Sequence, residues 1–306
     1  MLKSFKLVEG KLVECGTEGS CVSVYINPDE KEKAYLVNQA LIDEHTFNSS
    51  LDPDEVGRIE FESNHLAAII KKPKRYSSQD NFLFKVSSIG LFLFVDQLIV
   101  VTAENGSSFD KRIFSKMQSA KDAFLRIILD CIVHFEEHLK VIRRVSDELE
   151  SEINQAFSNK DLLNMFKLEK SLVYYLEAIN SNNKVIEKLK INSVKLGFSQ
   201  EVNEFLEDLF IEGAQCYQQS NSYSQVLSSM MDAWASIINN NLNIRIKTLT
   251  TLSLCIMTPT FVVSLFSMNV PLPIPQEGTL VSFWVVCAMA LLSVISIWLI
   301  WRYRKW

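Results

Sequence analysis

The segment HFEEH at residues 134–138 has the H-x-x-E-H spacing of one class of zinc peptidases. On a helix, His134 and His138 would share one face, and Glu137 could act as a general base. The sequence supplies no recognisable third ligand and no P-loop, nucleophile elbow or Ser/His/Asp arrangement elsewhere. Five-residue patterns of common residues also arise by chance in charged helices. We therefore interpret residues 134–150 as a charged surface helix, with solvated or salt-bridged side chains, and predict no enzyme.

A second set of side chains follows a helical repeat further along the chain. With successive residues 100° apart, an arc of about 120° contains Asp232, Asn239, Asn243, Ile246, Leu249, Met257 and Thr260. The face carries a carboxylate and amides, then apolar groups, then a hydroxyl. Around a symmetry axis it would line a pore with an acidic and amide mouth and an apolar constriction. An ordinary helix–helix seam explains the periodicity equally well.

The elements that would position this face are two charge-free segments, residues 248–268 and 280–301. About 20 apolar residues cross the ~30 Å hydrocarbon core of a bilayer as a helix, so we predict two transmembrane helices. The first carries threonines and Pro259, which favour a pore or other helices as neighbours. The second has Trp284, Trp298 and Trp301 near its ends, as residues at a membrane interface do.

Charge around the two segments predicts their direction. Basic residues precede the first segment and follow the second, whereas the connecting residues 269–279 contain Glu277 and no Lys or Arg. By the positive-inside rule the loop is extracellular, and the C-terminal residues 302–306 are cytoplasmic. The N-terminus lacks a signal peptide, so the body of this multi-pass cell-membrane protein is expected in the cytoplasm. The net charge of −5 gives no reason to expect nucleic acid as a partner.

The body divides by pattern into two regions. Residues 1–110 are predicted to be an α/β domain, with strands at 21–26, 66–72, 82–95 and 98–103, a hairpin turn at 96–97 and a short helix entered at Asp52 or Pro53. Residues 111–247 are predicted to be helical, with a helix from about 109, another over 161–192 and a break at Gly197. From Gln200 to Met268 no stop signal occurs, and ~69 residues at 1.5 Å rise give a helix of ~100 Å that must pack in a bundle with other helices.

The C-terminal hundred residues resemble the CorA family of magnesium transporters. The resemblance rests on the segments MDAW, NNNLNIRIKTLT, TPTFVVSLFSMN and WRYRKW, together with the order of the long helix, two spans and signature loop. It implies an α+β cytoplasmic domain followed by long stalk helices and two transmembrane helices, assembled as a funnel-shaped homopentamer. The first 110 residues match only in broad character.

The resemblance also implies roles for individual residues. The ion would be received by Asn269, Met268 and Ser267, and would then pass the pore-lining residues Thr260, Met257, Leu249, Ile246, Asn243 and Asp232. Glu277 would be a carboxylate of the outer loop. Asp208 would bind a regulatory divalent ion between subunits, with a partner carboxylate that the sequence does not place. Mg²⁺ would be both cargo and regulator, with no organic cofactor, and the partners would be other copies of the chain, the lipid bilayer and divalent cations.

Two departures from the family pattern leave alternatives open. Position 267 is Ser where the signature has Gly; if that Gly is needed for a positive φ, Ser costs about 1–2 kcal/mol. The loop reads NVPLPIPQEG rather than the acidic form. The alternatives to a Mg²⁺ channel are a transporter of Zn²⁺, Co²⁺ or Ni²⁺ with the same fold and a membrane-anchored divalent sensor without a working pore.

Overall fold

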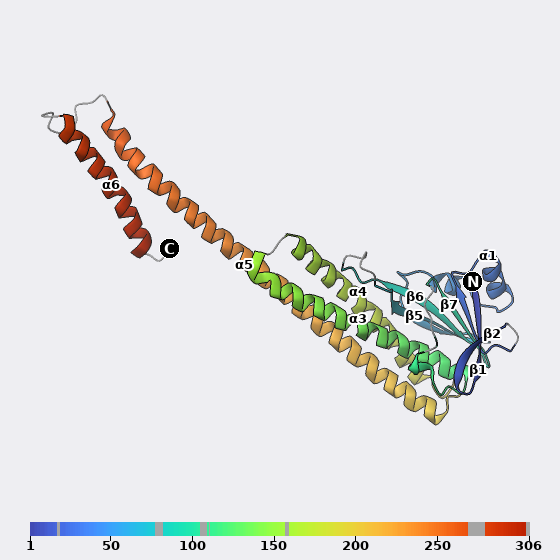
Figure 1. Cartoon of the computed structure of the whole chain (residues 1–306). Helices are drawn as coiled ribbons and strands as arrows, with labels where there is room; N and C mark the ends of the chain where they lie inside the picture. Colours follow the sequence, from blue (N-terminus) through green and yellow to red (C-terminus); the bar gives the residue numbers. More distant parts are fainter. Residues whose placement is uncertain are drawn as a thin grey trace. The chain divides into compact units, whose positions relative to one another are not determined.

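The first hundred residues form a seven-stranded mixed sheet (Figure 1). Its strands are β1 (Leu2–Val8), β2 (Lys11–Cys15), β3 (Val22–Ile26), β4 (Arg58–Phe61), β5 (Leu66–Pro73), β6 (Val86–Leu93) and β7 (Leu98–Thr102). The strand order is β2-β1-β3-β7-β6-β5-β4, in which β3 and β7 pair in parallel and the other neighbours are antiparallel. The central strands are almost wholly apolar because helices cover both faces of the sheet. The computed structural model describes residues 1–16, 19–76, 82–104, 109, 111–156, 159–268 and 279–303, without the side chains of 151–156, 159 and 279.

The four predicted strands are confirmed as β3, β5, β6 and β7, and β6 and β7 form the predicted hairpin, in which the Phe94 N–H donates to the Gln97 carbonyl at 2.8 Å. The short helix predicted from Asp52 is wrong. Those residues form turns that lead directly into β4, and the Asp52 side chain accepts a hydrogen bond from the Asp54 N–H at 2.9 Å, as in an Asx turn.

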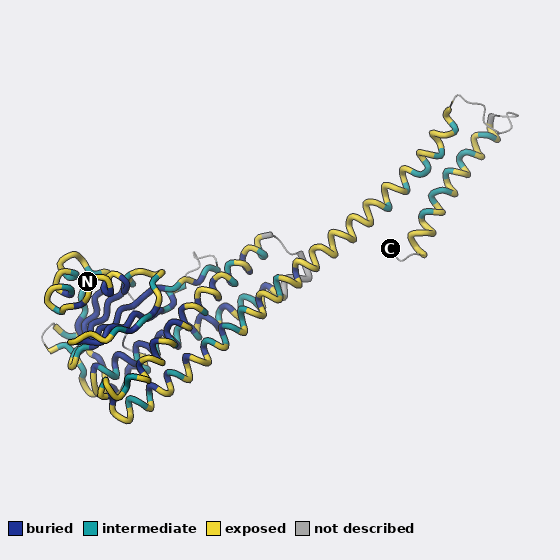
Figure 2. The backbone as a smooth tube through the Cα atoms, turned by 180° about the vertical axis from the view of Figure 1, so that it is seen from behind, coloured by how far each residue is buried: buried dark blue, intermediate teal, exposed yellow. Residues whose placement is uncertain are grey.

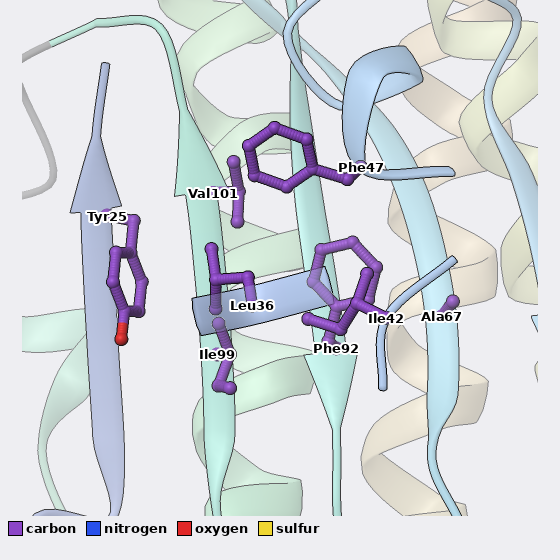
Figure 3. Packing of buried hydrophobic residues seen from close by; sticks show 8 residues of the cluster. All are labelled: Tyr25, Leu36, Ile42, Phe47, Ala67, Phe92, Ile99 and Val101. Atoms are coloured by element: carbon purple, nitrogen blue, oxygen red, sulfur yellow. The ribbon is translucent and has the colours of Figure 1, made fainter. Parts of the chain in front are cut away.

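Two short helices, α1 (Glu30–Asn38) and α2 (Glu44–Ser49), cover one face of the sheet. A capping box starts α1: Asp29 accepts from the Glu32 N–H at 2.8 Å, and the Glu32 carboxylate accepts from the Asp29 N–H at 3.0 Å. The buried side chains of the helices and of the segment between them meet those of the strands (Figure 3). This cluster consists of Tyr25, Leu36, Ile42, Phe47, Ala67, Phe92, Ile99 and Val101.

Long helices pack on the opposite face. Helices α3 (Ala120–Ala156) and α4 (Asn159–Ile191) contact the strands, and a 3₁₀ turn at Arg112–Phe114 precedes α3. The first part of α5 (Gln200–Phe266) packs against these two helices; for example, the Asn183 amide of α4 donates to the Gly213 carbonyl of α5 at 2.9 Å. The helix predicted from about 109 therefore begins at Ala120, whereas the other two begin and end within two residues of their predicted bounds. Asn182 of α4 fastens the layer to the sheet, because its amide accepts from the Lys71 N–H and donates to the Lys71 carbonyl, both at 2.8 Å.

By contact density the chain forms two compact units, Met1–Met231 and Asp232–Trp306. The second unit holds the last part of α5 and helix α6 (Thr279–Tyr303). Its side chains are mostly exposed, in contrast to those of the sheet (Figure 2); Leu249 is 65% and Trp284 67% accessible. Two helices, Gln200–Phe266 and Leu280–Tyr303, are long and apolar enough to cross a membrane, and no residue of their most apolar windows is buried. Soluble proteins rarely expose apolar surface of this extent, so lipid or other protein copies must cover it.

Candidate functional site

The predicted polar and apolar face lies on α5. Asp232, Asn239, Asn243, Ile246, Leu249, Met257 and Thr260 all belong to this one helix, and all seven are exposed. Because no break interrupts the helix between Asp232 and Thr260, the 100° spacing used to assign them to one face holds along the whole stretch. Exposed Leu249 and Met257, at 65% and 66%, leave the apolar middle of the face open to contact.

The last turns of α5 carry several oxygen atoms, of which the Thr260 hydroxyl belongs to this face. The hydroxyl of Thr260 donates to the Ile256 carbonyl at 2.7 Å, and that of Thr258 donates to the Leu254 carbonyl at 2.8 Å. Each hydroxyl keeps its lone pairs after donating and can still accept a hydrogen bond from a hydrated ion. Pro259 has no N–H, so the carbonyl of Cys255 lacks its usual helical donor. Oxygen is the ligand type that Mg²⁺ prefers.

Ser267, the first residue after α5, ends the helix with hydrogen bonds and without a positive φ. The Ser267 N–H donates to the carbonyls of Val263 and Ser264 at 3.1 and 3.3 Å, and its hydroxyl donates to the Ser264 carbonyl at 2.9 Å. Ser267 is not among the described residues with positive φ. The expected cost of replacing a left-handed Gly therefore does not arise here. Met268 is exposed, while Asn269 and Glu277 lie outside the described residues.

Asp208 lies on the part of α5 that packs in the first unit, and its side chain is exposed. Glu204 and Glu212, one turn before and one turn after it, are exposed as well, so the three carboxylates share a helical face. Within the described part of the chain, no group of three or more His, Cys, Asp or Glu side chains is arranged to hold a metal ion.

The HFEEH segment lies on α3, and our interpretation of it as a surface helix is wrong for the histidine face. His138 is only 9% exposed, and its Nδ1 lies 2.6 Å from the hydroxyl of Tyr175, which is fully buried. The His134 and His138 rings are 4.5 Å apart at their centroids. The sequence carried a signal for this burial, since apolar Cys131, Phe135, Leu139 and Ile142 flank the histidines at helical spacing.

Burial sets the charge of these histidines. Desolvation, followed by the nearby His134, lowers the pKa of His138 from 6.5 to about 4. Desolvation also lowers the pKa of His134. Near neutral pH His138 is therefore uncharged and packs as an aromatic residue between α3 and α4. Since Tyr175 occupies one of its ring nitrogens, it is poorly placed as a zinc ligand.

This burial predicts a loss of stability in acid. The folded pKa of His138, about 4, lies below its unfolded value of 6.5, so the unfolded chain binds more protons between these limits. The free energy of unfolding should fall as the pH is lowered through this window, and His134 and His65, whose pKa values burial also lowers, act in the same direction. Unfolding followed by circular dichroism from about pH 7 to 4 measures the slope.

A variant pair isolates the contribution of His138. His138→Phe should make the pH dependence shallower than that of the wild type and of the control His45→Gln, which replaces an exposed histidine on α2. Equal slopes for wild type and His138→Phe would show that the charge of His138 does not limit stability in acid.

Comparison with known proteins places this geometry in a family. A model of the family described as CorA-like Mg²⁺ transporter protein matches residues 24–304. The Cobalt/magnesium transport protein CorA of Methanocaldococcus jannaschii is 25% identical over 99% of this chain and 97% of its own length.

Solved structures agree in fold. The complete CorA magnesium transporter of M. jannaschii superposes with a TM-score of 0.79 at 22% identity, covering 98% of this chain and 96% of that one. The full-length CmaX protein gives a TM-score of 0.77 at 12% identity, covering 100% and 98% of the two chains. The α+β domain, long helices and C-terminal apolar helix predicted from the sequence are thereby confirmed. The prediction of no enzyme is confirmed, because the chain belongs to the CorA-like Mg²⁺ transporter family, whose members carry divalent cations across membranes and are not enzymes.

Proposed function

We propose that this chain conducts Mg²⁺ through a pore formed by a homopentamer in the cell membrane. The observation that carries the proposal is the uninterrupted face of α5 from Asp232 to Thr260, whose side chains are all exposed in the single chain. Five such faces around one axis would cover each other's apolar residues and enclose a path with polar ends. A single pair of spans would give the amides and the carboxylate, which precede the first span, no common path to line.

The order of side chains along the face suits a strongly hydrated ion. Mg²⁺ gives up water reluctantly, and a ring of Asn269 amides can hold the hydrated ion through its waters without trapping it. Met268 and Ser267 support this ring, and Thr260 supplies hydroxyls below it. Met257, Leu249 and Ile246 form an apolar constriction that can close by dewetting. Asn243 and Asp232 then receive the ion on the cytoplasmic side.

The same proposal fixes the direction of the chain in the membrane. Arg245 and Lys247 precede the first span, residues 248–268, and three basic residues follow the second span, residues 280–301. This distribution favours both termini in the cytoplasm and the loop with Glu277 outside. The outer carboxylates would concentrate cations near the Asn269 ring.

We further propose a regulatory Mg²⁺ site at Asp208. Glu204, Asp208 and Glu212 form an exposed acidic face that one chain does not complete into a metal site among its described residues. In a pentamer, carboxylates from a neighbouring subunit could supply the remaining ligands. Mg²⁺ bound there would offset repulsion between subunits, and its loss at low cytoplasmic Mg²⁺ would loosen the assembly.

Flux into proteoliposomes tests the channel directly. Vesicles that contain the purified full-length protein should take up more Mg²⁺, as reported by a Mg²⁺-sensitive dye, than protein-free vesicles. No increase would reject the proposed channel.

Cysteine substitutions test the proposed pore face in a background lacking Cys255 and Cys287. An external thiol reagent should block Met257→Cys and spare Val262→Cys, which lies on the opposite side of the helix. Equal block of both would reject the assigned face.

Co²⁺ is a second candidate cargo, and the name of a relative favours it. The relative from M. jannaschii is named as a cobalt and magnesium transport protein, and the cytoplasmic domain of ZntB from Vibrio parahaemolyticus has this fold, with a TM-score of 0.60 over 78% of this chain. The proposed pore face carries oxygen and apolar groups, and Cys255 lies off it, which favours Mg²⁺ over Zn²⁺ or Ni²⁺. Competition of each cation against Mg²⁺ uptake separates these cargoes.

Ser267 provides a test of the non-conducting alternative. Because Ser267 is unstrained and closes the helix by its own hydrogen bonds, Ser267→Gly should change Mg²⁺ flux by no more than about twofold. Ser264→Gly, inside α5, should lower the free energy of unfolding by about 1 kcal/mol, which is more than we expect for Ser267→Gly at the end of the helix. Flux that appears only after Ser267→Gly would instead support a sensor without a working pore.

A further inference from the structure

A small cavity lies in the unit Met1–Met231, between the sheet and α3. Its volume is about 140 Å³. Ile89, Phe114 and Ile127 form part of its apolar wall, while Lys72 from the end of β5 and His134 from α3 contribute nitrogen atoms. Sites for organic ligands usually measure about 300–1,000 Å³, so this cavity suits a small ion rather than a nucleoside.

The charges that line the cavity are unevenly paired. The cations are Lys72, Arg75 and Lys111, and the acids are Glu104, Asp130 and Glu137. Two of the acids already have cationic partners: Lys111 lies 2.7 Å from Asp130, and Lys74, which is outside the lining, lies 3.7 Å from Glu104. The third acid, Glu137, is exposed to solvent. Lys72, by contrast, forms no ion pair with a carboxylate in the described part of the chain.

His134 reports the potential inside the cavity. Burial is the largest cause of its lowered pKa, and the charges of Lys111, Lys72 and Arg75 lower that pKa further, while Asp130 acts against them. Among described residues His134 makes a ring contact with His138 but no hydrogen bond. Two half-buried nitrogen groups, the Lys72 ammonium and the His134 imidazole, therefore line this partly open cavity without a hydrogen-bond partner in the described chain.

We propose that this cavity binds a small tetrahedral oxyanion, either inorganic phosphate or the terminal phosphoryl group of a larger metabolite. Lys72 supplies a charge-assisted hydrogen bond, His134 a second donor, and Arg75 adds positive charge beside them. The proposed anion site shares no residue with the α5 face. Its test therefore does not depend on whether the chain conducts ions. The anion site would give the unit Met1–Met231 a response to an anion, in addition to the proposed response to Mg²⁺ at Asp208.

Calorimetry on the full-length protein in detergent tests the proposal, with inorganic phosphate titrated against chloride at equal ionic strength. Wild type should bind one phosphate per chain. Lys72→Gln should weaken binding about tenfold, the loss expected for one charge-assisted hydrogen bond, and Lys72→Arg should retain most of it. The matched control is Arg112→Gln, which removes the same charge from an exposed residue next to Lys111 but outside the lining.

The outcomes separate specific binding from general attraction. No saturable binding at millimolar phosphate, or an equal loss in Lys72→Gln and Arg112→Gln, would overturn the site. A second titration with ATP distinguishes the two sources of the anion. Binding of ATP that is tighter than that of phosphate, and that depends on Lys72, assigns a phosphoryl group; binding that is equal or weaker assigns inorganic phosphate.

Discussion

Replacing Asn269 with alanine is expected to reduce Mg²⁺ uptake into proteoliposomes at least about tenfold, which corresponds to about 1.4 kcal/mol in the rate-limiting barrier. In the proposed pentamer this change removes five amides at once from the place where the hydrated ion first leaves bulk water. A methyl group cannot accept hydrogen bonds from the inner-shell waters, and Mg²⁺ does not readily shed them. The loss should therefore appear in the maximal rate as well as in the apparent affinity.

Two further variants sharpen this result. Asn241→Ala removes an amide from α5 at a position about 140° from the centre of the proposed pore face, so uptake should stay near the wild-type rate. Asn269→Asp keeps the oxygens and adds charge, so it should bind Mg²⁺ more tightly and release it more slowly. Unchanged uptake in Asn269→Ala would remove the amide ring from the mechanism, even if the chain conducts.

The sequence was most informative where a local physical constraint acts over many residues. The membrane segments follow from the absence of charge between residues 248 and 268 and between 280 and 301, and α5 follows from the lack of Gly or Pro between Gly213 and Pro259. Pro259 did not end the helix, which continues to Phe266. In a membrane span, neighbouring groups can compensate for the missing donor of a proline.

Prediction failed where long-range contacts decide the structure. Strands β1 and β2 lie at one side of the sheet and place Lys6, Lys11 and Glu14 among apolar residues, a pattern that suits an edge but gives a weak strand signal. The register of α4 on β5 depends on Asn182 bonding Lys71, 111 residues away. No local pattern reveals such a pair.

For the candidate site, too, the sequence predicted what one helix determines and missed what depends on distant contacts. The periodicity of α5 showed which residues share a face, because a single helix determines it. It could not distinguish a pore from a helix seam, since that depends on copies of the chain around an axis. The histidines of α3 show the opposite case: their spacing suggested a metal, while a tyrosine 37 residues away gives His138 a packing role.

Tyr175→Ala is expected to produce the largest loss of stability in the first unit, about 3–5 kcal/mol. Tyr175 is completely buried, its ring lies 5.0 Å from that of Phe135 and 6.3 Å from that of Phe84, and its hydroxyl is 2.6 Å from His138. Truncation would leave a cavity between α3, α4 and the segment before β6, and would leave the buried His138 nitrogen without its partner.

Tyr174→Ala is the matched control, because the neighbouring side chain is 38% exposed and its main described contact is the Lys170 ammonium 5.7 Å from its ring. It should cost less than about 1 kcal/mol. Tryptophan fluorescence is a poor probe of either change, since all five tryptophans lie at position 234 or later. Hydrogen exchange of the β5 and β6 backbone amides measures the stability of the unit Met1–Met231 directly. Equal protection in the two variants would contradict the packing role, whereas faster exchange in Tyr175→Ala alone would show that this buried tyrosine joins the helical layer to the sheet.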